Sequence, residues 1–215
     1  MIRPLLATVF ASTLTVMSVD AAAQDAPPPS ARQNKAGYSP YPGEDYPNQV
    51  LFGDAHVHTS FSPDAGMIGN SLGPDDAYRF ARGETVTSSM GLQVRLNRPL
   101  DWMAVTDHAE GLGFAPLIVE SSPKVLDTEF GRKLHALFQE GTPAAAGEAW
   151  NLWAGSKFER KNPYSDNQEF AKEPWERIID AAEAATVPGR FTALIGFEWS
   201  STPGGKNLHR VVLYR

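Results

Sequence analysis

The residues best suited to chemistry in this sequence are histidines and carboxylates that follow short apolar stretches. His56 and His58 come shortly after Val50-Leu51-Phe52. In an extended strand, side chains two positions apart face the same way, so both imidazoles can reach one point. This spacing suits a pair of metal ligands, although it also occurs by chance. Asp64 follows in the next loop and can return a carboxylate to the same place.

Asp107 and His108 follow a second apolar stretch, Trp102-Met103-Ala104-Val105. We expect His108 to bind a metal ion, because it lies where a buried strand should end; the alternative is a packing histidine. Asp107 has three interpretations. It can orient a ligand from behind, take a proton from an attacking water, or cap the N-terminus of a following helix.

Glu198 follows a third apolar stretch, residues 193–197. An unpaired carboxylate would be costly to bury there, and metal coordination removes that cost. The alternative is a glutamate at the surface, paired with Arg210 or Lys206. His209 follows a flexible turn that can bring it beside Glu198, so we expect His209 to be a ligand as well.

The elements between these stretches predict an α/β protein. Continuous apolar stretches separated by amphipathic segments are typical of buried parallel strands, whose carboxyl ends collect site residues. A fourth stretch, Val211–Tyr214, follows His209, and extra elements between His108 and Glu198 should cover the mouth of the site. We expect helices from Pro74 to Gly83, from Leu126 to Gly141 with His135 on a packing face, and after Pro174 through Ala182, and a hairpin over residues 84–96.

Composition restricts the function further. The formal net charge is -6, so the protein lacks the positive charge that attracts the phosphate backbone of a nucleic acid. We therefore expect a small-molecule substrate and no nucleic acid. The sequence has no cysteine, so any metal must be held by histidines and carboxylates, which suit zinc, manganese or iron. Arg79, Arg82 and Lys206 are candidate contacts to a substrate anion, or else solvated surface charges.

The first residues predict export to the periplasm or the medium. Arg3 precedes an apolar segment, Leu5–Val19, and Ala21-Ala22-Ala23 suits signal peptidase cleavage before Gln24. The segment is short for a membrane span, so no integral span is expected after signal removal. We therefore expect a signal peptide over residues 1–23, a proline-rich leader over 24–48, and a catalytic domain over 49–215.

These residues also carry a family resemblance. The segment Gly53–Asp64, then Thr106–Glu110, then Gly196-Phe197-Glu198 and His209 resemble the first three motifs of the polymerase-and-histidinol-phosphatase (PHP) superfamily. The segment Ile68–Gly83 is similar to the DUF3604 branch of that superfamily. The resemblance implies a distorted (β/α)7 TIM-like barrel that hydrolyses phosphate esters with two or three divalent ions and metal-activated water.

The resemblance also implies a distribution of ligands and roles. His56, His58 and Glu198 would hold one ion, Asp64 and His108 a second, and Glu198 with His209 part of a third. Asp107, His108 and Glu198 would be the catalytic residues. A further histidine and an Asp-x-His motif are expected in the family but are not found before Arg215, so we expect this chain to be the N-terminal part of an incomplete barrel.

Three functions follow as hypotheses. The first is an exported phosphoesterase, and the second is a metallohydrolase of carboxylic esters, carbamate esters or amides. The third is a non-catalytic exported metal-binding protein. Activity on aryl phosphates against aryl esters separates the first two, and bound metal without turnover favours the third.

Overall fold

The computed structural model describes residues 50–158, 162–164, 167–201, 203 and 206–214. The expected signal peptide over residues 1–23 and the leader over 24–48 lie outside the described residues. Of the described helices, none is long and apolar enough to cross a membrane.

The fold is mixed α/β and is built on a curled four-stranded sheet. The strands lie in the order β1-β4-β5-β6, and β1, β4 and β5 are parallel. Their bounds are Gly53–Val57 for β1, Trp102–Val105 for β4, Thr192–Ser201 for β5 and Leu208–Leu213 for β6. Met103, Ala104 and Val105 are buried in the inner strand β4, which confirms the strand that the apolar pattern predicted.

The expectation of parallel strands throughout was wrong at β6. This strand is antiparallel to β5, with Ser200 opposite His209. The connection over residues 202–207 is too short for the crossover of about a dozen residues that a parallel neighbour requires, so the chain turns back as a hairpin. Glu198 consequently lies inside a long strand rather than at its end.

The expectation of a buried strand at Val50-Leu51-Phe52 was also wrong. These residues are exposed and precede β1, whose first pair joins Gly53 to Trp102. Val50, Leu51 and Phe52 therefore lie before the sheet begins and not within a buried strand.

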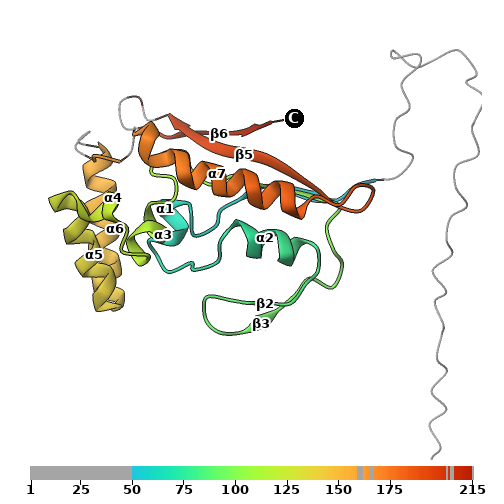
Figure 1. Cartoon of the computed structure of the whole chain (residues 1–215), viewed down its shortest axis with the longest axis horizontal. Helices are drawn as coiled ribbons and strands as arrows, with labels where there is room; N and C mark the ends of the chain where they lie inside the picture. The colour runs from blue at the N-terminus through green and yellow to red at the C-terminus, as the bar shows by residue number, and fades with distance from the viewer. Residues whose placement is uncertain (1–49, 159–161, 165–166, 202, 204–205, 215) are drawn as a thin grey trace, which may run out of the picture. The chain divides into compact units, whose positions relative to one another are not determined.

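Helices α2 (Pro74–Ala81) and α7 (Gln168–Ala185) pack together beside the sheet (Figure 1). Tyr78 and Ala81 of α2 share a buried cluster with Ala181 and Ala182 of α7 and with Val105. The helical pattern of the sequence places Ala77, Phe80 and Ala81 on one face; Ala81 is buried and Ala77 packs against the same cluster, whereas the buried Tyr78 was missed.

Helix α7 begins earlier than expected. The Asn167 side chain accepts a hydrogen bond from Phe170 N at 3.1 Å and caps the helix, which places Pro174 inside it rather than before its start. Phe170, Pro174 and Ile178 form one buried stripe at four-residue spacing, and this packing offsets the hydrogen bond that the proline ring removes.

Four further helices gather beyond the carboxyl end of β4 (Figure 1). They are α3 (Phe114–Val119), α4 (Pro123–Leu126), α5 (Glu129–Glu140) and α6 (Pro143–Phe158). Helix α5 follows the predicted periodicity from Phe130 to Phe138 and ends at Gly141, which adopts the left-handed conformation. The predicted start at Leu126 was wrong, because Leu126 ends the separate helix α4 and Thr128 caps α5. Helix α6 was not predicted, and it packs Trp153 against Phe114 in a second core.

Two small elements complete the described chain. Strands β2 (Val86–Thr87) and β3 (Gln93–Val94) pair as an antiparallel hairpin, as the sequence predicted. The short helix α1 (Pro63–Gly66) follows β1 and carries Asp64 in its only turn. It holds that carboxylate close to the end of β1.

Candidate metal centre

Four histidines and two carboxylates converge at one end of the sheet. His56 lies in β1 and His58 directly follows it, Asp64 lies in α1, His108 follows β4, Glu198 lies in β5 and His209 in β6. The structure thus brings together the six residues that the sequence analysis named as candidate ligands. His209 is the second residue of the antiparallel β6 and does not lie at the carboxyl end of a parallel strand, as His108 does.

Glu198 lies at the middle of the cluster. Its side chain is 1% exposed. Oxygen Oε2 lies 3.0 Å from His56 Nε2 and 2.7 Å from His58 Nε2, while Oε1 lies 2.6 Å from His209 Nδ1. The alternative of a surface glutamate paired with Arg210 or Lys206 is thus excluded, since Glu198 is buried among imidazoles.

Asp64 is the second carboxylate of the cluster and contacts two of its histidines. Its Oδ2 lies 3.0 Å from His58 Nδ1 and 3.4 Å from His108 Nε2. Ser62 Oγ donates a hydrogen bond to Asp64 Oδ1 at 2.6 Å. His58 therefore has one ring nitrogen against Asp64 and the other against Glu198.

The six side chains form three overlapping groups that could each hold a metal ion: His56, His58 and Glu198; His58, Asp64 and His108; and His108, Glu198 and His209. Within each group the ligand atoms lie within 4.8 Å of one another. Two ligands about 2.1 Å from one zinc ion are about 3.4 Å apart, so small side-chain movements bring each group to coordination distance. Nitrogen and carboxylate donors fit zinc, manganese or iron.

Electrostatics at the cluster favour a cation. Burial alone would disfavour the ionised forms of Asp64 and Glu198. Hydrogen bonds from His108, His58 and Ser62 nevertheless lower the pKa of Asp64 below its usual value. Contacts with the imidazoles of the cluster, His56 first, likewise lower the pKa of Glu198. Burial also opposes charge on His58, but Asp64 and Glu198 raise its pKa. Both carboxylates are thus ionised at neutral pH, and each can bind an ion.

Asp107 lies behind the cluster rather than in it. It is fully buried, and its two oxygens accept hydrogen bonds from Thr59 N at 2.5 Å and Thr59 Oγ1 at 2.8 Å. Burial raises the pKa of Asp107 to about 6. This geometry fits the interpretation in which Asp107 orients a ligand from behind, because Asp107 holds Thr59, the residue next to His58. The helix that follows is capped at Gly113 and not by Asp107.

Two buried serines also hold the ligands, and the sequence did not single them out for this role. Ser200 Oγ lies 2.8 Å from His108 Nδ1, and Ser62 Oγ accepts a hydrogen bond from His108 N at 3.2 Å. Strand alternation was an available signal for Ser200, because it lies two positions after Glu198 and shares its side of β5.

A cavity of about 250 Å³ lies beside the cluster. Its lining includes the candidate ligands Asp64, His108 and His209 and also Trp150 of α6. Helix α6, one of the elements expected to cover the site, thus lines this cavity, while the side chains of His56 and His209 are 57% and 41% exposed.

Glu110 also lines this cavity and was missed as a site residue. Its Oε1 accepts a hydrogen bond from Ser200 N at 3.0 Å, whereas its buried Oε2 has no hydrogen-bond partner among the described residues.

The remaining candidates are not among the six clustered residues. Arg79 pairs with Asp76 and Glu84, and Arg82 also pairs with Glu84, so these arginines are engaged away from the cluster. Lys206 is exposed. His135 lies on α5, where Ser121 Oγ is 3.0 Å from its Nε2, and it belongs to none of the three groups.

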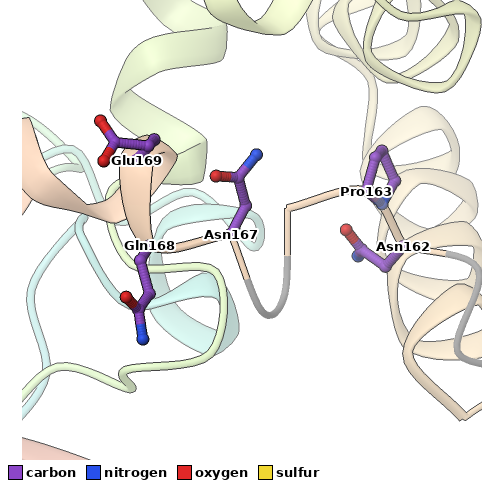
Figure 2. Close-up of a pocket in the computed structure, with 5 residues that line it drawn as sticks. All are labelled: Asn162, Pro163, Asn167, Gln168 and Glu169. Carbon is purple, nitrogen blue, oxygen red and sulfur yellow. The ribbon is translucent and has the colours of Figure 1, made fainter.

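A larger hollow of about 570 Å³ lies between the end of α6 and the start of α7, and its lining includes none of the clustered residues. Figure 2 shows Asn162 and Pro163 on one side of it, Gln168 and Glu169 on the other, and Asn167 between them. These side chains stand apart rather than converge, and Asn167 is already used as the cap of α7. The hollow is therefore not a second centre.

Comparison with known proteins identifies the family. Residues 45–215 match the model of a family described as "Protein of unknown function (DUF3604)". No curated protein matches the chain, and no solved structure does. The match spans the sheet, the helices and all six clustered residues, so the chain belongs to the DUF3604 family.

Proposed function

We propose that this protein is an exported metal-dependent hydrolase of the PHP superfamily that cleaves phosphate esters. The finer fold that we propose is a distorted (β/α)7 barrel, since three parallel strands carry ligands at one end of a curled sheet. The antiparallel β6 departs from a simple repeat of strand and helix. Export is supported by the apolar segment Leu5–Val19 and the small residues that follow it.

The observation that carries the proposal is the position of His58 between two carboxylates. A neutral imidazole has one N–H, so only one of its nitrogens can donate a hydrogen bond. With contacts of 3.0 Å to Asp64 and 2.7 Å to Glu198, a neutral ring would leave one carboxylate facing a nitrogen without a proton, so either the ring is protonated or a cation lies on at least one side. Because Glu198 and His108 are each shared between groups as well, the arrangement suits two or three neighbouring ions better than one.

The protein's own residues would then have distinct tasks. The three groups would hold the ions, which when bound supply an activated water and neutralise charge on the substrate. Asp107 fixes Thr59, next to His58, and Ser200 orients the ring of His108. Fixed ligands of this kind keep the reacting centre in one geometry, which is a large part of what such sites contribute to the rate.

A second candidate is hydrolysis of carboxylic esters, carbamate esters or amides. Trp150 and Trp153 give the cavity an apolar wall, and Glu110 adds a negative charge. Among the described residues that line the cavity there is no lysine or arginine to hold a phosphate dianion. These features favour an uncharged substrate, while the metal ligands are the same for both candidates.

One experiment separates the candidates. The purified protein is stripped with chelator, reloaded in parallel with zinc, manganese or iron, and assayed on an aryl phosphate, an aryl carboxylic ester and an aryl carbamate. We expect hydrolysis of the phosphate to return with metal in the wild type and to stay absent in Glu198→Gln. Turnover of only the uncharged esters would support the second candidate, and bound metal with no turnover would support a non-catalytic metal-binding protein.

A further inference from the structure

The cavity beside the metal ligands is lined by polar side chains and by residues of one helix. His108 and His209, which belong to the same ligand group, are among the polar lining residues. Trp150, Trp153 and Ala154 lie close together on α6, and we call them the aromatic wall. A molecule in this cavity would therefore touch the edge of the metal centre and a pair of indoles at the same time.

The aromatic wall is formed by the protein's own packing. Trp153 is 3% exposed, and its ring centre lies 4.3 Å from that of Phe114. It also fills the space over Gly111, where an added Cβ would come within 2.2 Å of the indole. Trp150 is only partly buried and lies one helical turn before Trp153, so its exposed part is free for contact with a ligand.

The charge of the cavity restricts what can lie there. Asp64 and Glu110 contribute carboxylates, and the buried Oε2 of Glu110 has no partner among the described residues. A negatively charged group would be repelled on this side, while a hydrogen-bond donor would satisfy that oxygen. The cavity of about 250 Å³ is larger than the roughly 150 Å³ cavity that holds benzene in an engineered protein, so it accommodates one or two rings.

From these features we infer that the cavity is the leaving-group site of the hydrolase and takes an uncharged planar ring, stacked on Trp150. The inference rests on the proposed function and holds for either class of ester. In the reaction, water adds its oxygen to the phosphorus or carbonyl carbon, and the bond from that atom to the leaving oxygen breaks. The leaving oxygen keeps the electron pair of that bond and takes a proton from the water, so the product released from the cavity is an aryl alcohol.

The first test measures binding without turnover. Naphthol is titrated into metal-loaded and metal-stripped protein by calorimetry. Trp150→Ala should weaken naphthol binding at least about tenfold, because it removes the stacking surface. Ala154→Leu should weaken it similarly by filling the cavity while keeping both indoles. Asn151→Ala, at an exposed position on the same helix, should bind as wild type does. Circular dichroism checks folding, and Trp150→Phe keeps a smaller ring if the alanine variant is unstable.

The second test compares leaving groups on the same acid. For each variant, the kcat/KM for a naphthyl ester is divided by the kcat/KM for the butyl ester of the same acid. A change that affects the hydrolysis of both esters equally leaves this ratio unchanged, so the ratio reports on the leaving group alone. Trp150→Ala should lower this ratio about tenfold to a hundredfold while metal content stays unchanged.

The outcomes separate the two proposals. If esters are hydrolysed but neither naphthol binding nor the ratio depends on Trp150, the leaving-group site is wrong and the hydrolase stands. If no ester is hydrolysed while naphthol binding still depends on Trp150 and Ala154, the proposed function is wrong and the cavity remains a site for planar rings. Loss of binding together with a lower ratio supports both.

Discussion

Replacement of Asp107 by asparagine should change how stability depends on pH. Burial raises the pKa of Asp107 to about 6 from an ordinary value of 3.8, even though Thr59 donates two hydrogen bonds to it. A difference of about two pKa units corresponds to about 3 kcal/mol. Ionised Asp107 therefore destabilises the folded protein by about that amount relative to its protonated form.

The direction of the effect follows from the raised pKa. A carboxyl group that is harder to ionise when folded contributes stability that is fully present below about pH 4 and is lost as pH rises through about 6. Asparagine cannot ionise, so Asp107→Asn avoids this loss. The free energy of unfolding of the variant minus that of wild type should increase by about 3 kcal/mol between pH 4 and pH 7.5, or about 6 to 12 °C in melting temperature.

The assay is thermal or urea denaturation of both proteins in chelator, at several pH values across this range. Asp75→Asn, in the exposed first turn of α2, controls for removal of a carboxyl group as such. A difference between Asp107→Asn and wild type that stays constant with pH, or that falls as pH rises, would refute the reasoning about burial of Asp107.

Three further predictions concern stability. Gly111→Ala should destabilise the protein by about 3 kcal/mol, because φ is +79° at Gly111 and the new Cβ would meet Trp153. Gly141→Ala, at a positive φ in open space, should cost about 1 kcal/mol. Thermal denaturation of both variants measures the difference. Leu134→Ala should cost about 3 kcal/mol in urea denaturation because this side chain is fully buried, and Gln139→Ala on the exposed side of α5 should cost under about 0.5 kcal/mol. Metal-free protein should lose stability in acid, because folding lowers the pKa values of Asp64 and Glu198. The stability that these carboxylates contribute is present above about pH 4.5 and is lost as pH falls through their lower folded pKa values. A series of melting temperatures that stayed flat below about pH 4 would contradict this.

The ligand cluster was predictable because its signal is local. Two of the three apolar stretches lie in strands, residues 102–105 in β4 and residues 193–197 in β5, and parallel strands bring their carboxyl ends to one edge of the sheet. That reasoning placed His56, His58, His108 and Glu198 together although they lie far apart in sequence. It failed for the direction of β6, because the pattern of apolar residues does not say whether a strand runs parallel or antiparallel.

The supporting residues were not predictable because their roles depend on distant partners. Glu110 is held at the site by a hydrogen bond from Ser200 N, ninety positions away in sequence. Trp153 is held beside the cavity by its contact with Phe114. Helix α6 has three alanines after Pro143 and includes Gly147 and Gly155. Its sequence therefore lacks the helical spacing of apolar residues that identified α5. Its place over the cavity is set by tertiary packing.

Metal content of the His56→Ala variant against His135→Ala tests the central claim most directly. His56→Ala removes an imidazole from the group that contains His58 and Glu198, whereas His135 belongs to no group. Elemental analysis after reloading should find two or three ions per chain in wild type and His135→Ala, and fewer in His56→Ala, with hydrolysis lower by orders of magnitude. Equal metal content in the two variants, or hydrolysis that survives exhaustive chelation, would show that these histidines form a structural cluster and not a metal centre.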